Sequence, residues 1–95
     1  MPASKRGANS GAAQIGSRVR ARRIKKRLSL DQLGMDIGVS GPQIARYERG
    51  ENHINSVTLR KLARALECSP LELLEDEQQR QEYLSGSFDF KREGK

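Results

Sequence analysis

The sequence is poor in the residue types on which large or covalently stabilised folds depend. It has one cysteine, Cys68, no tryptophan, and aromatic residues make up only 4% of the chain. A lone cysteine excludes an intrachain disulfide and favours a reducing cytoplasm. With 35% hydrophobic residues among 95, the chain can build a small aliphatic core, but not the large cavity that many enzymes use.

Long hydrophobic runs are also missing. No apolar stretch approaches the roughly 18 residues that a membrane span requires, and the start of the chain does not have the pattern of a signal peptide. We therefore expect a cytoplasmic protein without membrane contact. The residues after about position 75 are too few for a ligand-binding or protease domain, so we expect a stand-alone protein with one domain.

Acidic residues are absent from the first third of the chain. Every charged side chain of residues 1–28 is basic, whereas acidic and basic side chains are nearly balanced in residues 29–95. This asymmetry accounts for the net charge of +6 and favours a polyanion such as nucleic acid as the partner. The alternative is a basic arm that only keeps a small protein soluble.

The middle of the chain has a helical pattern. Residues 1–13 are small, polar and rich in glycine and serine, and they predict a flexible basic arm. Apolar residues then recur at helical spacing, between serine, asparagine, proline and glycine residues suited to helix termini. These signals predict an all-α domain over residues 14–75, with helices at about residues 14–27, 30–37, 41–49 and 70–74, and one that is capped by Asn55 or Ser56 and runs to about residue 66.

The second and third of these helices are short and close together. Ser29 and Ser40 each stand three residues before a glutamine, which is the spacing of a capping box. Gly38 lies between them, where a left-handed residue would end the first helix and start a tight turn. Gly34 is expected where the two helices cross, and a side chain larger than alanine there would push them apart. Two short helices joined in this way match the helix-turn-helix pattern.

Residues 76–95 form a polar tail that still contains three of the four aromatic residues, Tyr83, Phe88 and Phe90. Residues 75–84 could extend as a helix, and residues 87–91 alternate like an edge strand. The tail is either frayed, or its aromatic side chains pack onto a second subunit.

Residues 15–74 resemble the Cro/repressor-type (XRE) helix-turn-helix domain of phage repressors and small bacterial transcriptional regulators. The resemblance is carried by Ile15, Val19, Arg23, Leu28, Ser29, Leu33, Gly34, Ile37, Gly38, Val39, Ser40, Ile44, YERGE at 47–51 and LRKLARALECSPLELL at 59–74. It implies a five-helix, lambda-repressor-like fold and a sequence-specific regulator, more specifically a repressor, of a bacterium or phage. It also implies a homodimer on a roughly palindromic operator in double-stranded DNA, with the fifth helix and the aromatic tail as the candidate dimer surface.

The resemblance further implies roles for individual residues. The third helix is expected to enter the major groove with its N-terminal half against the base edges. The base-reading positions are then Ser40, Gly41, Pro42, Gln43 and Arg46. The phosphate-binding positions are Arg23, Arg49, Asn52 and His53. Arg23 is expected, above all, to form a structural ion pair with Glu48.

Two of the proposed base-reading residues have an alternative role. Arg46 could bind the O6 and N7 atoms of a guanine with both guanidinium nitrogens, or it could be a solvated surface side chain. Gln43 could pair with adenine or phosphate, or it could only complete the capping box of Ser40. Many relatives carry glutamine where this chain has Leu30, and polar side chains where it has Gly41 and Pro42. DNA shape should therefore contribute to recognition.

A protein-binding adaptor is the alternative function, because Leu30, Gly41 and Pro42 make the base-reading face less polar. An enzyme is the least favoured class, since the sequence has no Ser/His/Asp set, no glycine-rich phosphate loop before a helix and no acid/base pair for a pocket. His53 is the only histidine and one thiol stands elsewhere, so no metal, cofactor or small-molecule site is expected.

Overall fold

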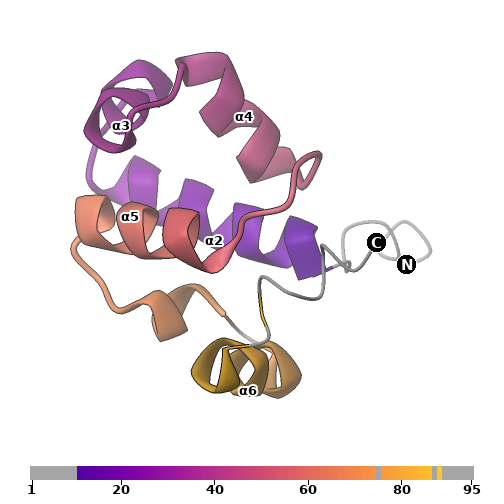
Figure 1. The fold of residues 1–95 in the computed structure, drawn as a ribbon. Helices are drawn as coiled ribbons and strands as arrows, with labels where there is room; N and C mark the ends of the chain where they lie inside the picture. Colours follow the sequence, from indigo (N-terminus) through magenta and orange to yellow (C-terminus); the bar gives the residue numbers. More distant parts are fainter. Residues whose placement is uncertain (1–10, 75, 87, 89–95) are drawn as a thin grey trace, which may run out of the picture.

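A computed structural model of the chain describes residues 11–74, 76–86 and 88. Within them the chain forms five α-helices and one 3-10 helix: α2 (Gly11–Lys25), α3 (Leu30–Ile37), α4 (Gly41–Arg49), α5 (Ser56–Leu66), η1 (Pro70–Leu73) and α6 (Glu77–Ser85). The long helix α2 runs through the middle, with α3 and α4 on one side and α5 beside it (Figure 1). The described residues contain no strand, so the predicted all-α class is confirmed for them.

The helix boundaries differ from the predicted ones at both ends of the domain. Helix α2 begins at Gly11, so residues 11–13, which were expected in the arm, are helical, and residues 1–10 lie outside the described residues. The predicted helix at 70–74 is a 3-10 helix. It ends at Leu73, because Leu74 takes an extended conformation (φ −110°, ψ 116°).

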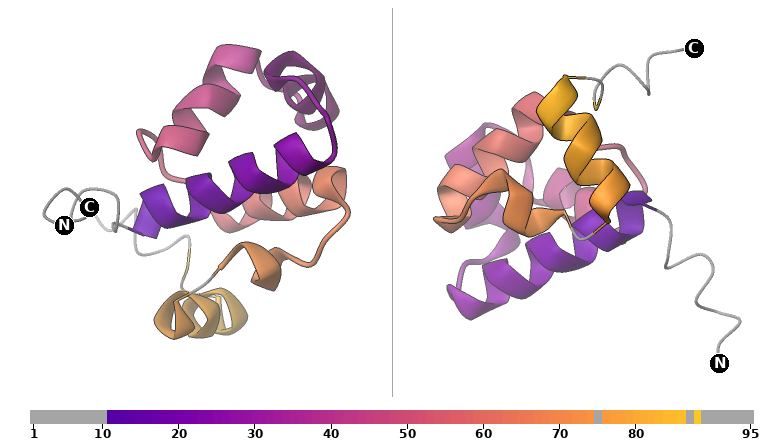
Figure 2. Two further views of the ribbon diagram at one scale, coloured as in Figure 1. Left: turned by 180° about the vertical axis from the view of Figure 1, so that it is seen from behind. Right: turned by 90° about the horizontal axis from the view of Figure 1, so that it is seen from below.

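Helix α6 shows that the segment after the domain continues as a helix. Asp76 caps its first turn by accepting a hydrogen bond from the backbone N–H of Gln78. The helix lies on the side of the molecule opposite α3 and α4, next to η1 (Figure 2). The edge strand predicted for residues 87–91 lies outside the described residues, apart from Phe88.

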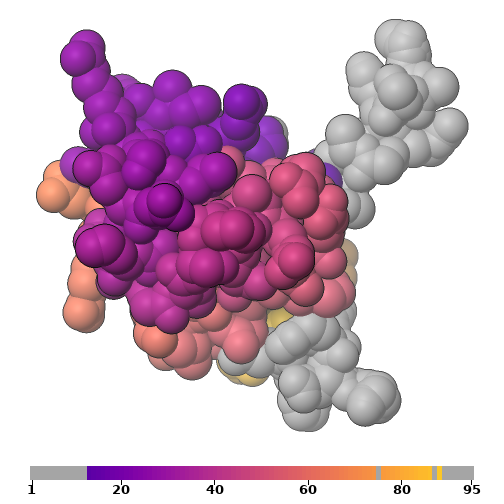
Figure 3. All heavy atoms as spheres, turned by 90° about the horizontal axis from the view of Figure 1, so that it is seen from above, coloured from indigo at the N-terminus to yellow at the C-terminus, as the bar shows by residue number. Residues whose placement is uncertain are grey.

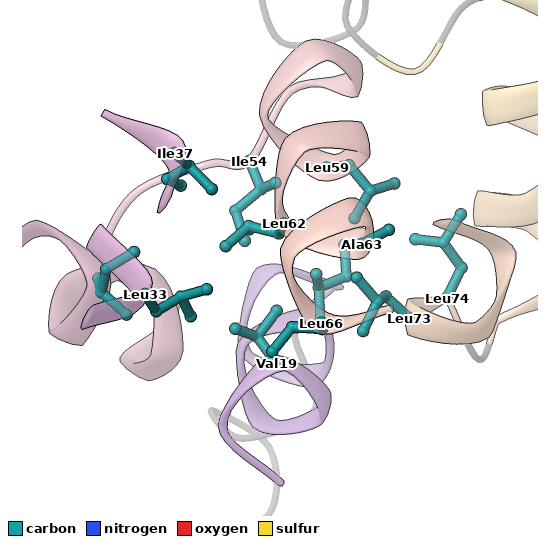
Figure 4. Packing of buried hydrophobic residues seen from close by; sticks show 12 residues of the cluster. Val19, Leu33, Ile37, Ile54, Leu59, Leu62, Ala63, Leu66, Leu73 and Leu74 are labelled. Atoms are coloured by element: carbon teal, nitrogen blue, oxygen red, sulfur yellow. The ribbon is translucent and has the colours of Figure 1, made fainter. Parts of the chain in front are cut away.

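The core is small and aliphatic, as the composition predicted. Its buried side chains are Ile15, Val19, Leu33, Ile37, Ile44, Ile54, Leu59, Leu62, Ala63, Leu66, Leu73 and Leu74. Four of them recur at helical spacing on one face of α5 and lie between Val19 of α2 and the η1 leucines (Figure 4). Each fully buried leucine or isoleucine contributes about 1.5–3 kcal/mol, so this cluster is a main contribution to the packing of α3 and α4 on α2.

Two glycines allow helix backbones to approach closely. A Cβ atom at Gly16 would lie 2.5 Å from the carbonyl oxygen of Glu48 and would also overlap that of Tyr47. A Cβ atom at Gly34 would overlap the carbonyl oxygen of Val39. The expectation that alanine would fit at Gly34 is therefore wrong, because even a methyl group there requires the turn after α3 to move.

Candidate nucleic-acid interface

The turn between α3 and α4 is held by caps on both helices. The Ser29 hydroxyl accepts a hydrogen bond from the backbone N–H of Gln32 (3.0 Å), and the Gln32 side chain accepts one from the backbone N–H of Ser29 (2.7 Å). Gly38 ends α3 in the left-handed conformation, with φ 81°. Ser40 then caps α4 by accepting from the backbone N–H of Gln43 (3.1 Å). The predicted helix-turn-helix geometry is thus present, and both short helices have fixed ends.

Figure 3 shows the face of the molecule that α3 and α4 cover. On α4, Ser40, Pro42 and Arg46 are exposed and Gln43 is partly exposed. Gly41 does not lie with them: it is buried, and the Asp31 carboxylate occupies the space that a Cβ atom at Gly41 would need. Of the five predicted base-reading positions, only the other four therefore offer a side chain at this surface.

The Gln43 side chain does not fold back onto Ser40. Its Oε1 atom accepts a hydrogen bond from Nη1 of Arg46 (3.3 Å), and its Nε2 atom donates to Oδ1 of Asn52 (3.2 Å). The alternative that Gln43 only completes a capping box is therefore wrong. The three side chains form a hydrogen-bonded row that joins the exposed side of α4 to the loop after it.

Arg49, the last residue of α4, is paired with an acid of the loop that follows. Its guanidinium donates to Glu51 from Nε (2.7 Å) and from Nη2 (3.1 Å) across the turn at Gly50, whose φ is 77°. These hydrogen bonds lower the pKa of Glu51 and raise that of Arg49. His53, two residues after Glu51, is exposed. Sequence reasoning missed Glu51 as a competitor for Arg49, although a pair of residues two apart around a left-handed glycine is a local signal that could have revealed it.

Arg23 and Glu48 form a bidentate ion pair between α2 and α4. The Nε–Oε2 distance is 2.6 Å and Nη2–Oε1 is 3.1 Å, while Nη1 donates to the carbonyl oxygen of Leu28 (2.9 Å). The side chains are only 12% and 5% exposed. Arg23 thus joins α2 to α4, and because three of its nitrogens already donate within the chain, little of its guanidinium is left for phosphate.

Several cations of α2 and of the turn after it also have partners inside the chain. Arg22 pairs with Glu72 (2.9 Å) and Lys26 pairs with Glu67 (2.8 Å), which lowers the pKa of Glu67. Arg18 donates to the carbonyl oxygen of Glu72 (3.4 Å). These contacts fix η1 and the end of α5 on α2. The acid-free first third is therefore partly neutralised by residues 67–72, and its charge is less available to a polyanion than the sequence suggested.

The described aromatic residues of the tail pack within the chain. The rings of Tyr83 and Phe88 meet edge to face, 6.2 Å apart, and both are partly buried against the core. Leu73 and Leu74 of the predicted fifth helix are fully buried. Tyr83 and Phe88 are therefore not frayed, whereas packing of the aromatic tail onto a second subunit stays a prediction, and Phe90 lies outside the described residues.

The part of the chain that the structure describes contains no group of three or more His, Cys, Asp or Glu side chains able to hold a metal ion. None of its helices is long and apolar enough to cross a membrane. Cys68 packs against the core, and burial raises the pKa of its thiol.

Comparisons of the sequence with known proteins give one consistent result. The sequence model of the helix-turn-helix family matches residues 19–73. The HTH-type transcriptional regulator y4wC of Sinorhizobium fredii, itself uncharacterised, is 34% identical over 73 residues, which cover 77% of this chain and 51% of the relative. Repressor protein C2 of Salmonella phage P22 is 43% identical over 60 residues, which cover 63% of this chain and 28% of the repressor. The chain thus spans about half, or less, of the length of these two relatives.

Two solved structures are similar in both fold and sequence. The P22 c2 repressor in complex with a synthetic operator has a TM-score of 0.61 and 43% identity, over 64% of this chain and 92% of that chain. The restriction-modification controller protein C.AhdI of Aeromonas hydrophila has a TM-score of 0.63 and 33% identity, over 66% and 91% of the two chains. The predicted fold class is confirmed by these similarities.

Proposed function

Because the chain belongs to the helix-turn-helix family, we propose that it is a sequence-specific DNA-binding transcriptional regulator that places α4 in the major groove. The observation that carries this proposal is the exposed face of α4. There Ser40, Pro42, Gln43 and Arg46 lie beside a loop with further polar side chains, on a helix joined to α2 by a largely buried ion pair. The similarity to repressor C2 of phage P22 supports repression as the mode of regulation.

The side chains on this face divide by chemistry. Arg46 is proposed to bind a guanine edge, because a guanidinium can donate to O6 and N7 at once. Ser40 and Pro42 are short enough to touch a base or the backbone next to the N-terminus of α4. Arg49 at the end of α4, and Asn52 and His53 in the loop after it, are proposed to contact phosphates, which position the protein without reading sequence.

We propose that two copies bind together. One such module contacts one half-site, and useful affinity requires two half-sites about one helical turn apart on a roughly palindromic operator. The sedimentation coefficient of the free protein and of its complex with an operator duplex tests this proposal. A complex that stays at one copy per duplex at saturating protein would contradict it.

The Arg46→Ala variant should lose specific binding. Selection from a random-sequence duplex pool with the unaltered protein should yield an inverted repeat. Affinity of Arg46→Ala for that repeat should then fall by about 10- to 100-fold, with the preference lost at one guanine of each half-site. The matched control is Arg64→Ala on α5, which removes the same charge and should leave the preference unchanged. If no repeat emerges, and Arg46→Ala binds like the unaltered protein, the domain is a protein-binding adaptor instead.

The Glu51→Gln variant should bind all duplexes more tightly. In the free protein Glu51 holds the Arg49 guanidinium at 2.7 Å, and a phosphate must displace this carboxylate. The pKa of Glu51 is lowered by the pairing, so the competition persists at neutral pH and weakens only as the pH falls through that lowered value. Without it, affinity should rise several-fold, and the dependence of log affinity on log salt should steepen by about 0.9 for one extra neutralised phosphate.

The control for this variant is Glu82→Gln on α6, which removes the same charge from the opposite side of the molecule. Titration of both variants at three salt concentrations separates a local effect from the change in net charge. Equal gains for Glu82→Gln and Glu51→Gln would show that Arg49 does not bind phosphate.

A further inference from the structure

The same local sequence, Ser-x-x-Gln, starts both α3 and α4, but the two glutamines behave differently. In α3 the Gln32 side chain returns to the backbone N–H of Ser29 (2.7 Å). In α4 the Gln43 side chain instead lies between Arg46 (3.3 Å) and Asn52 (3.2 Å). The backbone N–H of Gln43 is still capped by Ser40, so the difference concerns the side chain alone.

The direction of these hydrogen bonds is set by Arg46. A guanidinium has no acceptor, so Arg46 can only donate, and the atom of Gln43 that faces it must be the amide oxygen. The Gln43 Nε2 group then faces Asn52 and must donate to its oxygen. It follows that the Asn52 amide turns its own NH₂ group, which only donates, away from Gln43. The row therefore has one polarity from Arg46 to Asn52.

We propose that Gln43 is a positioning residue that couples a base contact of Arg46 to a phosphate contact of Asn52. This inference rests on the proposed DNA-binding function. Arg46 keeps the rest of its guanidinium for a guanine edge, while the outward NH₂ group of Asn52 suits a phosphate oxygen, which only accepts. A phosphate bound at Asn52 fixes its amide, which fixes Gln43, which orients Arg46. The base contact of Arg46 and the phosphate contact of Asn52 then strengthen each other.

This coupling predicts a pattern of affinities that would not arise if Asn52 only contacted a phosphate independently of Arg46. Asn52→Ala should lower affinity for the selected operator by about tenfold, and should lower affinity for random DNA much less. The Asn52→Ala effect on the operator should largely disappear when Arg46 is already alanine, because Arg46 is then no longer there to be oriented. It should also disappear in Gln43→Met, which keeps the length of the side chain and removes both polar ends.

The matched control is His53→Ala, the neighbouring residue of the same loop. As a phosphate contact without a link to Gln43, it should lower affinity for operator and random DNA by the same factor. Its effect should multiply with that of Arg46→Ala, as expected for independent sites.

The experiment is a double-mutant cycle in the full-length chain. The unaltered protein and each variant are titrated against the selected operator and against a random duplex. Side-chain amide NMR signals of Gln43 in the free protein give a second measurement, and they should shift in Asn52→Ala but not in His53→Ala. The coupling is overturned if the effects of Asn52→Ala and Arg46→Ala on the operator multiply to within about twofold. It is also overturned if Asn52→Ala lowers operator and random affinity equally. In both cases Arg46→Ala still loses affinity for the operator and the preference for one guanine of each half-site, so the proposed function stands. If no operator is selected at all, the function and the coupling fail together.

Discussion

The Arg23→Met variant should lose about 3 kcal/mol of the free energy of unfolding, the lower end of the cost of removing one partner of a buried ion pair, because this pair keeps some exposure to water. Glu48 is only 5% exposed, and without Arg23 its carboxylate would remain buried without its two hydrogen-bond donors. The carbonyl oxygen of Leu28 would lose its donor as well. Urea unfolding followed by far-UV circular dichroism measures the loss.

Two variants test the cause of that loss. Arg23→Met combined with Glu48→Leu replaces both charges by apolar groups, and it should recover most of the stability. Arg22→Met breaks a pair whose side chains are 37% and 50% exposed, so it should cost at most about 1 kcal/mol. If Arg23→Met costs no more than Arg22→Met, water has access to Glu48 and the pair does not hold α4 on α2.

The parts of the fold that the sequence predicted correctly are those governed by local rules. The capping box at Ser29 and the left-handed Gly38 each depend on residues within a few positions of one another, and both are present in the structure. The leucines of α5 lie on one face because helical spacing alone puts them there.

The parts that it missed depend on partners far apart in the sequence. Arg22 and Lys26 read as free basic residues, but their acids lie 50 and 41 positions later. The sequence suggested that Gly41 is exposed. It is covered only because α3 packs against α4 and places Asp31 over it, which the sequence does not show. The partners of Gln43 were hidden for a related reason, since the turn at Gly50 has to return the chain before Asn52 can reach it.

Replacing Gly16 by alanine should destabilise the protein by about 3 kcal/mol, the upper end of the usual cost of overpacking. The sign of this change is informative, because replacing a glycine inside a helix by alanine normally stabilises the protein by about 0.5–1 kcal/mol. Here the new methyl group would overlap the carbonyl oxygens of Tyr47 and Glu48. Those are backbone atoms, which cannot rotate away, so α2 and α4 must separate and strain the ion pair of Glu48.

Gly41→Ala provides the matched control, because it adds the same methyl group at the start of α4. The methyl group would overlap only the Asp31 carboxylate, the end of a flexible and exposed side chain, and the nearest backbone atom, the Asp31 nitrogen, is 3.3 Å away. The stability should therefore change by less than about 1 kcal/mol. Chemical denaturation of the two variants compares a methyl group that overlaps backbone atoms with one that overlaps a side chain. A Gly16→Ala protein as stable as the unaltered one would mean that α2 and α4 cross farther apart than the structure places them. The orientation of α4 would then depend on the buried ion pair and the core, rather than on close contact at the glycine.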